Sequence, residues 1–156
     1  MPLLIQRNLS FDLALEAATA ALETARSRGY HVGVALTDRS GQLLVLLRDD
    51  GGGAHLLDGA RRKAFTAVSA HNRTSVLSKA VDTRSGEPDP HLVFLENVLM
   101  VGGGVPIKAG DEIVGAIGVS GSPGSVHDEE CAEAGIAKIA ASLTTAPNAT
   151  EGHRSC

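Results

Sequence analysis

The sequence predicts an α+β fold, in which an antiparallel sheet of about five strands is flanked by helices. Apolar residues recur at helical spacing in some segments and at strand spacing in others, in the order helix, two strands, two or three helices, three strands, helix. Short turns separate neighbouring strands, and such turns join antiparallel pairs, whereas parallel strands need long crossovers. Helices placed before, between and after the strands are expected on the faces of the sheet.

The first helix is expected to follow Ser10, whose side chain can cap it. Apolar residues then recur at steps of three and four, which predicts one buried helix face: Phe11, Leu15, Ala18, Leu22 and Ala25. Gly29 is expected to end the helix, because glycine readily adopts the left-handed conformation found after helix C-termini.

A hairpin is predicted next, with strands at 32–36 and 43–47 joined by the turn residues 38–41. The second strand consists of five consecutive apolar residues, Leu43 to Leu47. Strands that are apolar on both faces are typical of the covered centre of a sheet. We therefore expect 43–47 to be a central strand.

Two helices are predicted in the middle of the chain. The first carries an apolar stripe of Leu57, Ala60, Ala64 and Ala67, and Thr74 is expected to cap a short second one. The polar segment 84–90 contains two prolines, which predicts a mobile loop.

Three strands and a helix complete the pattern, with strands at 98–101, 105–107 and 113–119. Ser125 and Asp128 have the spacing of a capping box at the start of the last helix. The apolar stripe of that helix is Ala132, Ile136, Ile139 and Leu143. We expect a single domain over residues 1–143 and a flexible tail over 144–156.

Composition restricts the class of function. The 156 residues are enough for one domain with a sizeable core, and the net charge of −4 disfavours a nucleic-acid surface. No apolar stretch is long enough to span a membrane, and residues 1–7 lack the features of a secretion signal. Two cysteines give no disulfide framework. These observations predict a cytoplasmic protein without nucleic-acid or membrane partners; the small-molecule ligand is expected from the candidate sites below.

The glycine run Gly102, Gly103 and Gly104 is a candidate ligand-binding loop, because backbone N–H groups can bind a phosphate or a carboxylate. The run matches neither the dinucleotide-binding nor the P-loop pattern. A structural turn that leads into the next strand explains it equally well.

Polar residues at the start of the last helix form a second candidate. His127 beside Asp128 can act in acid–base chemistry, although carboxylates in a first turn also complement the helix dipole. His127 and Cys131 are four residues apart and share a helix face, where they could ligate a metal. No second ligand pair has finger spacing, so we expect no structural metal site and interpret Cys131 as a small core residue.

A third group surrounds the second helix. Arg48 and Asp49 follow an apolar strand, and their side chains either line a cleft or are simply exposed to solvent where the strand ends. His55 lies near the start of the second helix. Lys63 is flanked by alanines, so its stem is expected to be buried, with the ammonium in a pocket or at the surface. Three further histidines stand alone at the ends of predicted helices or strands: His31, His71 and His91. We expect each of them to be exposed at the surface or to have its hydrogen bonds satisfied within the protein.

Several segments also resemble one family in their order and spacing: 34–38 with Gly41, 47–51, Ala60 with 63–67, 103–107, 115–121 and 128–135. Over about residues 10–143 they resemble the GlcG/HbpS/PduO C-terminal-domain family. The resemblance implies a profilin-like α+β fold and commonly a homo-oligomer. Some members are similar to haem-binding sensors, and others accompany cobalamin-processing enzymes or small-acid catabolism.

Two main functions stay open. In the first, the protein binds haem or a related tetrapyrrole, with His55, His127 and His31 as candidate iron ligands. In the second, it is a cofactor-independent acid–base enzyme, an isomerase, lyase or hydrolase, that acts on a small carboxylate metabolite. A third, an interaction module whose oligomeric surface is the function, is a lesser alternative.

Each residue would have a defined role in the enzyme alternative. His127 would be the acid or base, and Arg48 and Lys63 would bind the carboxylate or an oxyanion. Asp49 or Asp128 would orient the base.

Overall fold

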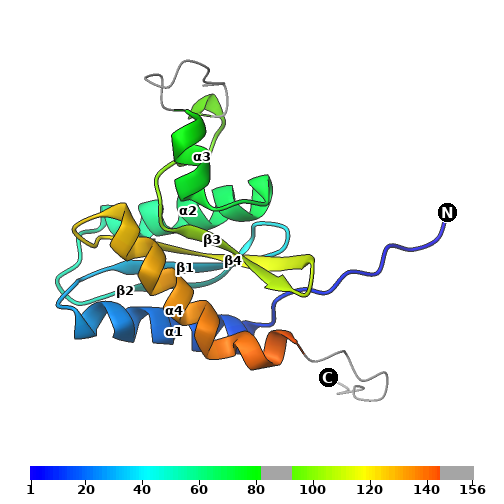
Figure 1. Cartoon of the computed structure of the whole chain (residues 1–156), viewed down its shortest axis with the longest axis horizontal. Helices are drawn as coiled ribbons and strands as arrows, with labels where there is room; N and C mark the ends of the chain where they lie inside the picture. The colour runs from blue at the N-terminus through cyan, green and yellow to red at the C-terminus, as the bar shows by residue number, and fades with distance from the viewer. Residues whose placement is uncertain (82–92, 145–156) are drawn as a thin grey trace.

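The computed structural model describes residues 1–81 and 93–144 of the chain. The described elements are α1 (Phe11–Ser27), β1 (Gly33–Asp38), β2 (Leu43–Arg48), α2 (His55–Ala70), α3 (Thr74–Ala80), β3 (Gly104–Ala109), β4 (Glu112–Ser120) and α4 (Ser125–Leu143) (Figure 1). This order and the antiparallel pairing confirm the predicted α+β class.

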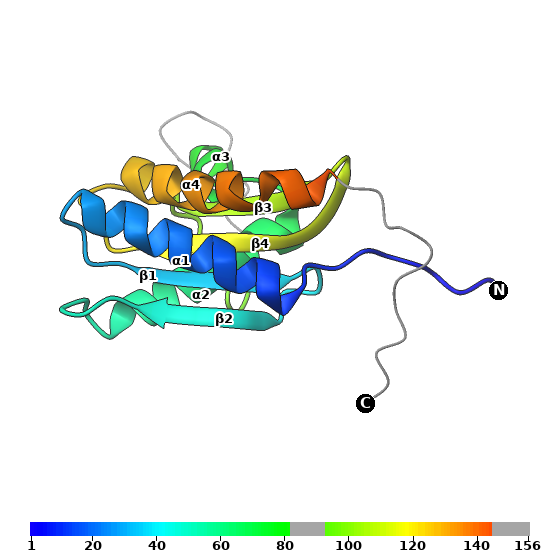
Figure 2. The same ribbon diagram turned by 90° about the horizontal axis from the view of Figure 1, so that it is seen from below.

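The strands form one antiparallel sheet in the order β2-β1-β4-β3. Helices α1 and α4 lie side by side on one face, and α2 covers the other (Figure 2). The short helix α3 follows α2 beside β3 (Figure 1). Each face therefore meets different helices, and the ends of the strands are where groups from both layers can meet.

Two expectations about the sheet were wrong. Residues 98–101 do not form a strand, so the described sheet has four strands rather than about five. Side chains of α2 bind the backbone of this segment instead: Arg62 Nη2 donates to the Val98 carbonyl (3.0 Å), and Leu99 N–H donates to Thr66 Oγ1 (2.9 Å). Because these groups take the place of strand partners, the segment runs past α2 as an irregular connection.

Strand β2 is also an edge strand, not a central one, because β1 pairs with β2 on one side and with β4 on the other. Leu43 and Leu46 remain 41% and 38% exposed. A run of apolar residues predicts a strand, but it does not decide how many neighbours the strand has.

The observed helix ends agree in part with those predicted from the sequence. Ser10 caps α1 through its Oγ, which accepts from Leu13 N–H (3.3 Å), and Gly29 follows the helix with φ of 76°. Thr74 and Ser125 are instead the first residues of α3 and α4, and neither helix has a side-chain cap at the preceding residue. The expected capping box is therefore absent from the described start of α4.

The core is built mainly from small residues. The buried face of α1 is Ala14, Ala17, Ala18, Ala21, Leu22 and Ala25. Phe11 and Leu15, which were expected on that face, are exposed. Cys131 is fully buried in the same core, as expected. On the other face, α2 approaches the sheet so closely that a Cβ on Gly118 would lie 2.1 Å from the Ala60 carbonyl oxygen.

The expected mobile loop at 84–90 and most of the tail at 144–156 lie outside the described residues. Among the helices that the structure describes, none is both long and apolar enough to cross a bilayer.

Candidate functional site

A buried ion pair joins the two helical layers. Lys63 of α2 and Asp128 of α4 have side chains only 4% and 5% exposed, and Lys63 Nζ lies 2.8 Å from Asp128 Oδ2. The same ammonium donates to the Val119 carbonyl oxygen (3.0 Å), and Asp128 Oδ1 accepts from Ser122 N–H (3.0 Å). Both charges are thus satisfied inside the protein, as buried charges must be.

The glycine run packs directly over this ion pair. Gly103 has φ of 125°, and a Cβ there would lie 2.9 Å from Asp128 Cβ and 3.0 Å from Lys63 Nζ. A Cβ on Gly104 would lie 2.3 Å from the Lys63 carbonyl oxygen, and its N–H donates to Thr74 Oγ1 (2.8 Å). Gly102 passes close to Ser125. These close approaches favour the structural explanation of the run.

A second cluster lies where β2 ends. Asp49 is buried and accepts from Arg26 Nε (2.8 Å) and from Asp50 N–H (2.9 Å), and its Oδ2 lies 3.3 Å from His31 Nδ1. The Arg26 hydrogen bond is the main reason why the pKa of Asp49 is lowered. The neighbouring Arg48 has no hydrogen bond to this cluster among the described residues; its Nη1 donates to the Gly52 carbonyl (2.5 Å).

His127 belongs to a third, more exposed group. Its Nδ1 lies 3.5 Å from Glu130 Oε2, and its ring centroid is 5.7 Å from that of Tyr30. Arg28 also pairs with Glu130 and is the main cause of the lowered pKa of that carboxyl. His55 is the exposed first residue of α2.

The residues predicted for catalysis therefore occupy different places. The structure brings Lys63 and Asp128 together, and Gly103 with them. Within the described part of the chain, no hydrogen bond or ion pair joins His127 to Lys63 or Arg48. The described contacts therefore do not link His127 directly to Lys63 or Arg48, the two cations proposed to bind a carboxylate.

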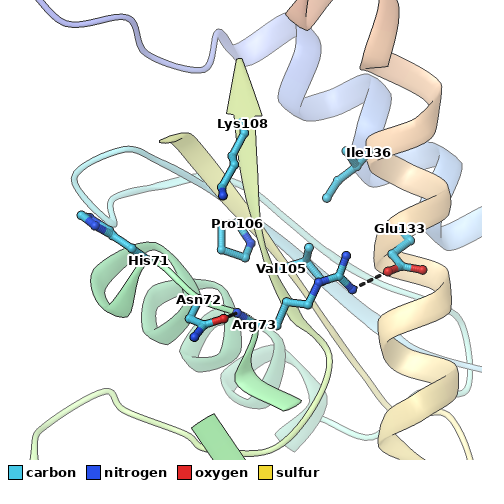
Figure 3. A pocket seen from close by; sticks show the side chains of 8 residues that line it. All are labelled: His71, Asn72, Arg73, Val105, Pro106, Lys108, Glu133 and Ile136. Carbon is cyan, nitrogen blue, oxygen red and sulfur yellow. Dashed lines mark hydrogen bonds and ion pairs between the residues drawn. The ribbon is translucent and has the colours of Figure 1, made fainter. Parts of the chain in front are cut away.

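A groove of about 440 Å³ lies elsewhere, between the α2–α3 connection, β3 and α4 (Figure 3). We call it the His71 groove, and its lining residues are His71, Asn72, Arg73, Val105, Pro106, Lys108, Glu133 and Ile136. Figure 3 shows Pro106 at its centre, with Lys108 above, His71 and Arg73 at its sides, and Ile136 projecting from α4. The groove combines an apolar floor with basic side chains.

The charges in the groove are unevenly paired. Arg73 Nη1 binds Glu129 Oε1 (2.7 Å) and also pairs with Glu133, and these two carboxylates raise the pKa of the guanidinium. Lys108 is exposed and has no carboxylate partner among the described residues. An anionic group in the groove would therefore find an available cation in Lys108.

The backbone at His71 is unusual. This residue ends α2 in the left-handed conformation, with φ of 54° and ψ of 34°, and its N–H donates to the Ala67 carbonyl. Glycine or asparagine usually fills such a position, because a Cβ is disfavoured there. A histidine at a strained position is a reason to look for a role of its side chain.

The sequence predicted that His71 lies at the surface or has its hydrogen bonds satisfied, and His71 is exposed; the sequence did not connect it with Arg73 or Lys108. His71 and Arg73 directly follow α2, whereas Lys108 belongs to β3. Only the fold places these two segments side by side. The position of His71 just after the apolar stripe of α2 was the only sequence signal. Among the described residues, no group of three or more histidine, cysteine or acidic side chains could hold a metal ion alone.

Comparison with known proteins gives a family match. The family model described as "Haem degrading protein HbpS-like" matches residues 9–137. Over 113 residues the chain is 25% identical to an uncharacterized 15.0 kDa protein of Citrobacter freundii from the dhaT-dhaS intergenic region, covering 70% of this chain and 80% of that one.

Solved structures agree with this match. A double mutant of HbpS from Streptomyces reticuli is 42% identical with a TM-score of 0.80, covering 86% of this chain and 89% of that one. A PduOC:haem complex is 27% identical with a TM-score of 0.77, covering 85% and 95%.

Proposed function

Since the chain belongs to the HbpS-like family, we propose that it binds haem or a closely related tetrapyrrole, and that the ligand lies in the His71 groove. The observation that carries the proposal is the groove itself, which combines a histidine, an apolar surface and a lysine without a carboxylate partner among the described residues. Relatives that share the fold include a protein solved as a haem complex.

The residues of the groove fit the chemical requirements of haem. A haem site needs a ligand for the iron, apolar contact for the macrocycle and polar partners for the propionates. His71 would be the iron ligand, because a neutral imidazole is a common ligand for iron. Val105, Pro106 and Ile136 offer the apolar contact.

The propionates would be held by positive charge. Lys108 is exposed at the groove and is the side chain best placed to pair with a carboxylate. Arg73 would contribute less, because Glu129 and Glu133 already bind it. When bound, haem supplies an iron that can exchange ligands and electrons, while the protein supplies its position.

The volume of the groove, about 440 Å³, lies within the range of about 300–1,000 Å³ typical of small-molecule sites. The groove is not enclosed by protein, so a large planar ligand would remain partly exposed.

A haemin titration followed by absorbance tests the proposal. The wild-type protein is expected to give saturable one-to-one binding with a shifted Soret band, and His71→Ala is expected to lose that shift. Lys108→Met should weaken binding by up to about fivefold, because one solvent-exposed ion pair contributes about 1 kcal/mol or less.

Two matched controls use the histidines that the sequence singled out. His55→Ala and His127→Ala alter histidines outside the groove and should leave the Soret band unchanged. Loss of the band in either control, with His71→Ala unaffected, would move the ligand away from this groove. Absence of saturable binding in the wild-type protein would overturn haem binding altogether.

His71→Gly separates binding from folding. Glycine relieves a left-handed conformation that costs on the order of 1 kcal/mol for other residues. This variant should therefore be at least as stable as the wild type in thermal unfolding and still lose the shifted Soret band.

A further inference from the structure

The two sides of the His71 groove carry opposite charges. On one side is β3, where Pro106 and the exposed Lys108 share a face of the strand. On the other side is α4, where Glu133 and Ile136 are three residues apart and share a helix face (Figure 3). Lys108 has no carboxylate partner among the described residues. The groove therefore offers an available cation beside β3 and a carboxylate beside α4.

Arg73 does not make the α4 side positive. Its Nη1 lies 2.7 Å from Glu129 Oε1 and also pairs with Glu133, so one guanidinium serves two carboxylates. The three side chains together keep a net negative charge, and the Glu133 side chain is 48% exposed. A ligand carboxylate on this side of the groove would therefore meet a net negative group instead of an available cation.

The surface between the two charged sides is apolar. Val105 is buried, and Pro106 and Ile136 are partly buried in the same lining. A carboxylate that is moved from water onto apolar surface loses free energy of hydration unless it gains a partner. A ligand can gain such a partner at Lys108, whereas its remaining perimeter should be uncharged.

We propose that Glu133 makes the groove selective for tetrapyrroles whose carboxylates all lie on one edge. This inference rests on the proposed function and defines the ligand class of the same groove. Haem and its iron-free form, protoporphyrin IX, carry both propionates on one edge and only hydrocarbon groups elsewhere. Coproporphyrin III carries propionates around the whole ring, so one of them would face Glu133 when others pair with Lys108. Glu133 would thus act through repulsion of the wrong ligand.

The exposure of the groups sets the size of the preference. One pair of solvent-exposed charges changes an affinity by up to about fivefold. Loss of apolar contact at the additional propionates adds to this effect. The interaction is electrostatic, and the screening length falls from about 10 Å in 0.1 M salt to about 3 Å in 1 M salt. The preference should therefore decrease at high salt, which a preference based on shape alone would not do.

Titration with protoporphyrin IX and with coproporphyrin III, followed by porphyrin fluorescence, tests the selectivity. Neither porphyrin contains iron, so the measurement does not depend on His71 as a ligand. The wild-type protein is expected to bind protoporphyrin IX at least about fivefold more tightly at low salt. Glu133→Gln also frees Arg73 from one of its two carboxylates, so both affinities should rise. Coproporphyrin III should gain more, and the ratio of the two affinities should fall about three- to fivefold.

Glu130→Gln is the matched control. Glu130 lies on the same helix, pairs with Arg28 and has a side chain that is 43% exposed, against 48% for Glu133. It is not among the residues that line the His71 groove. The control removes the same charge from the protein as a whole, so it should leave the ratio of the two affinities unchanged.

The outcomes separate this inference from the proposed function. If neither haemin nor the porphyrins bind saturably, the proposed function fails and the selectivity fails with it. If haemin binds, three results would overturn the selectivity alone: equal affinities for the two porphyrins, equal effects of Glu133→Gln and Glu130→Gln, or a preference unchanged in 1 M salt. Haemin binding without measurable binding of protoporphyrin IX would also overturn it, because the iron alone would then hold the ligand.

Discussion

Asp128→Asn tests whether the buried ion pair is what joins α2 to α4. The substitution keeps the side-chain shape and an oxygen for Ser122 N–H, but it leaves the Lys63 ammonium without its carboxylate. Removing one partner of a buried pair costs about 3–5 kcal/mol, because an uncompensated charge stays buried. Lys63 is 4% exposed, so water cannot replace the lost partner without local opening.

The loss is large enough to measure by thermal unfolding. In a chain of this length each kcal/mol shifts Tm by about 2–4 °C, so Asp128→Asn should lower Tm by about 6–20 °C. Circular dichroism would follow the transition, and urea unfolding would give the free energy directly.

A double variant makes the test specific. Asp128→Asn leaves the Lys63 ammonium buried without a carboxylate partner, and Lys63→Met removes that ammonium. The double variant should therefore recover a large part of the lost stability. Glu130→Gln breaks the exposed pair with Arg28 and should change Tm little. The reasoning fails if Asp128→Asn is as stable as the wild type, or if the double variant is no more stable than the single one.

Three further predictions concern other parts of the fold. Gly118→Ala should destabilise the protein by several kcal/mol or prevent folding, as judged by urea unfolding, because its Cβ would meet the Ala60 carbonyl oxygen at 2.1 Å. Hydrogen bonds from Arg7 and Arg39 lower the pKa of Glu112 from 4.5 to about 2, so their stabilisation is present above pH 4.5 and lost as the pH falls towards 2. Glu112→Gln should flatten the dependence of Tm on pH in that window. Burial raises the pKa of the Cys131 thiol, so in Cys156→Ala protein a thiol reagent should label Cys131 only after unfolding.

Local patterns predicted most of the helices and strands but not their partners. Ser10 and Gly29 fix the ends of α1 through contacts within a few residues, and these are legible in a single sequence. The position of β2 at the sheet edge depends instead on β1 pairing with β4, far along the chain. The strand predicted at 98–101 was wrong for the same reason: the backbone of this segment binds side chains of α2, which lie more than 30 residues away in the sequence.

The candidate site was harder to predict for the same reason. Lys63 was recognised as a lysine with a buried stem, but its partner Asp128 comes from the opposite layer of the fold. The sequence neighbours of His71 do not distinguish it from other surface histidines, whereas its left-handed backbone and the nearby Lys108 are seen only in the structure.

The segments that resemble the family explain why the fold was easier to predict than the function. They contain Lys63, Gly103, Gly118, Asp128 and Gly135, and the structure places each of these at a close contact or in the buried ion pair. Such residues determine whether the layers can approach each other, so they specify the architecture. Five of the eight residues that line the His71 groove lie outside those segments: His71, Asn72, Arg73, Lys108 and Ile136. Changes in the first group should therefore alter stability, and changes in the groove should alter ligand binding with little effect on folding. If Asp128→Asn and His71→Gly changed both properties together, this separation of fold from binding would be wrong.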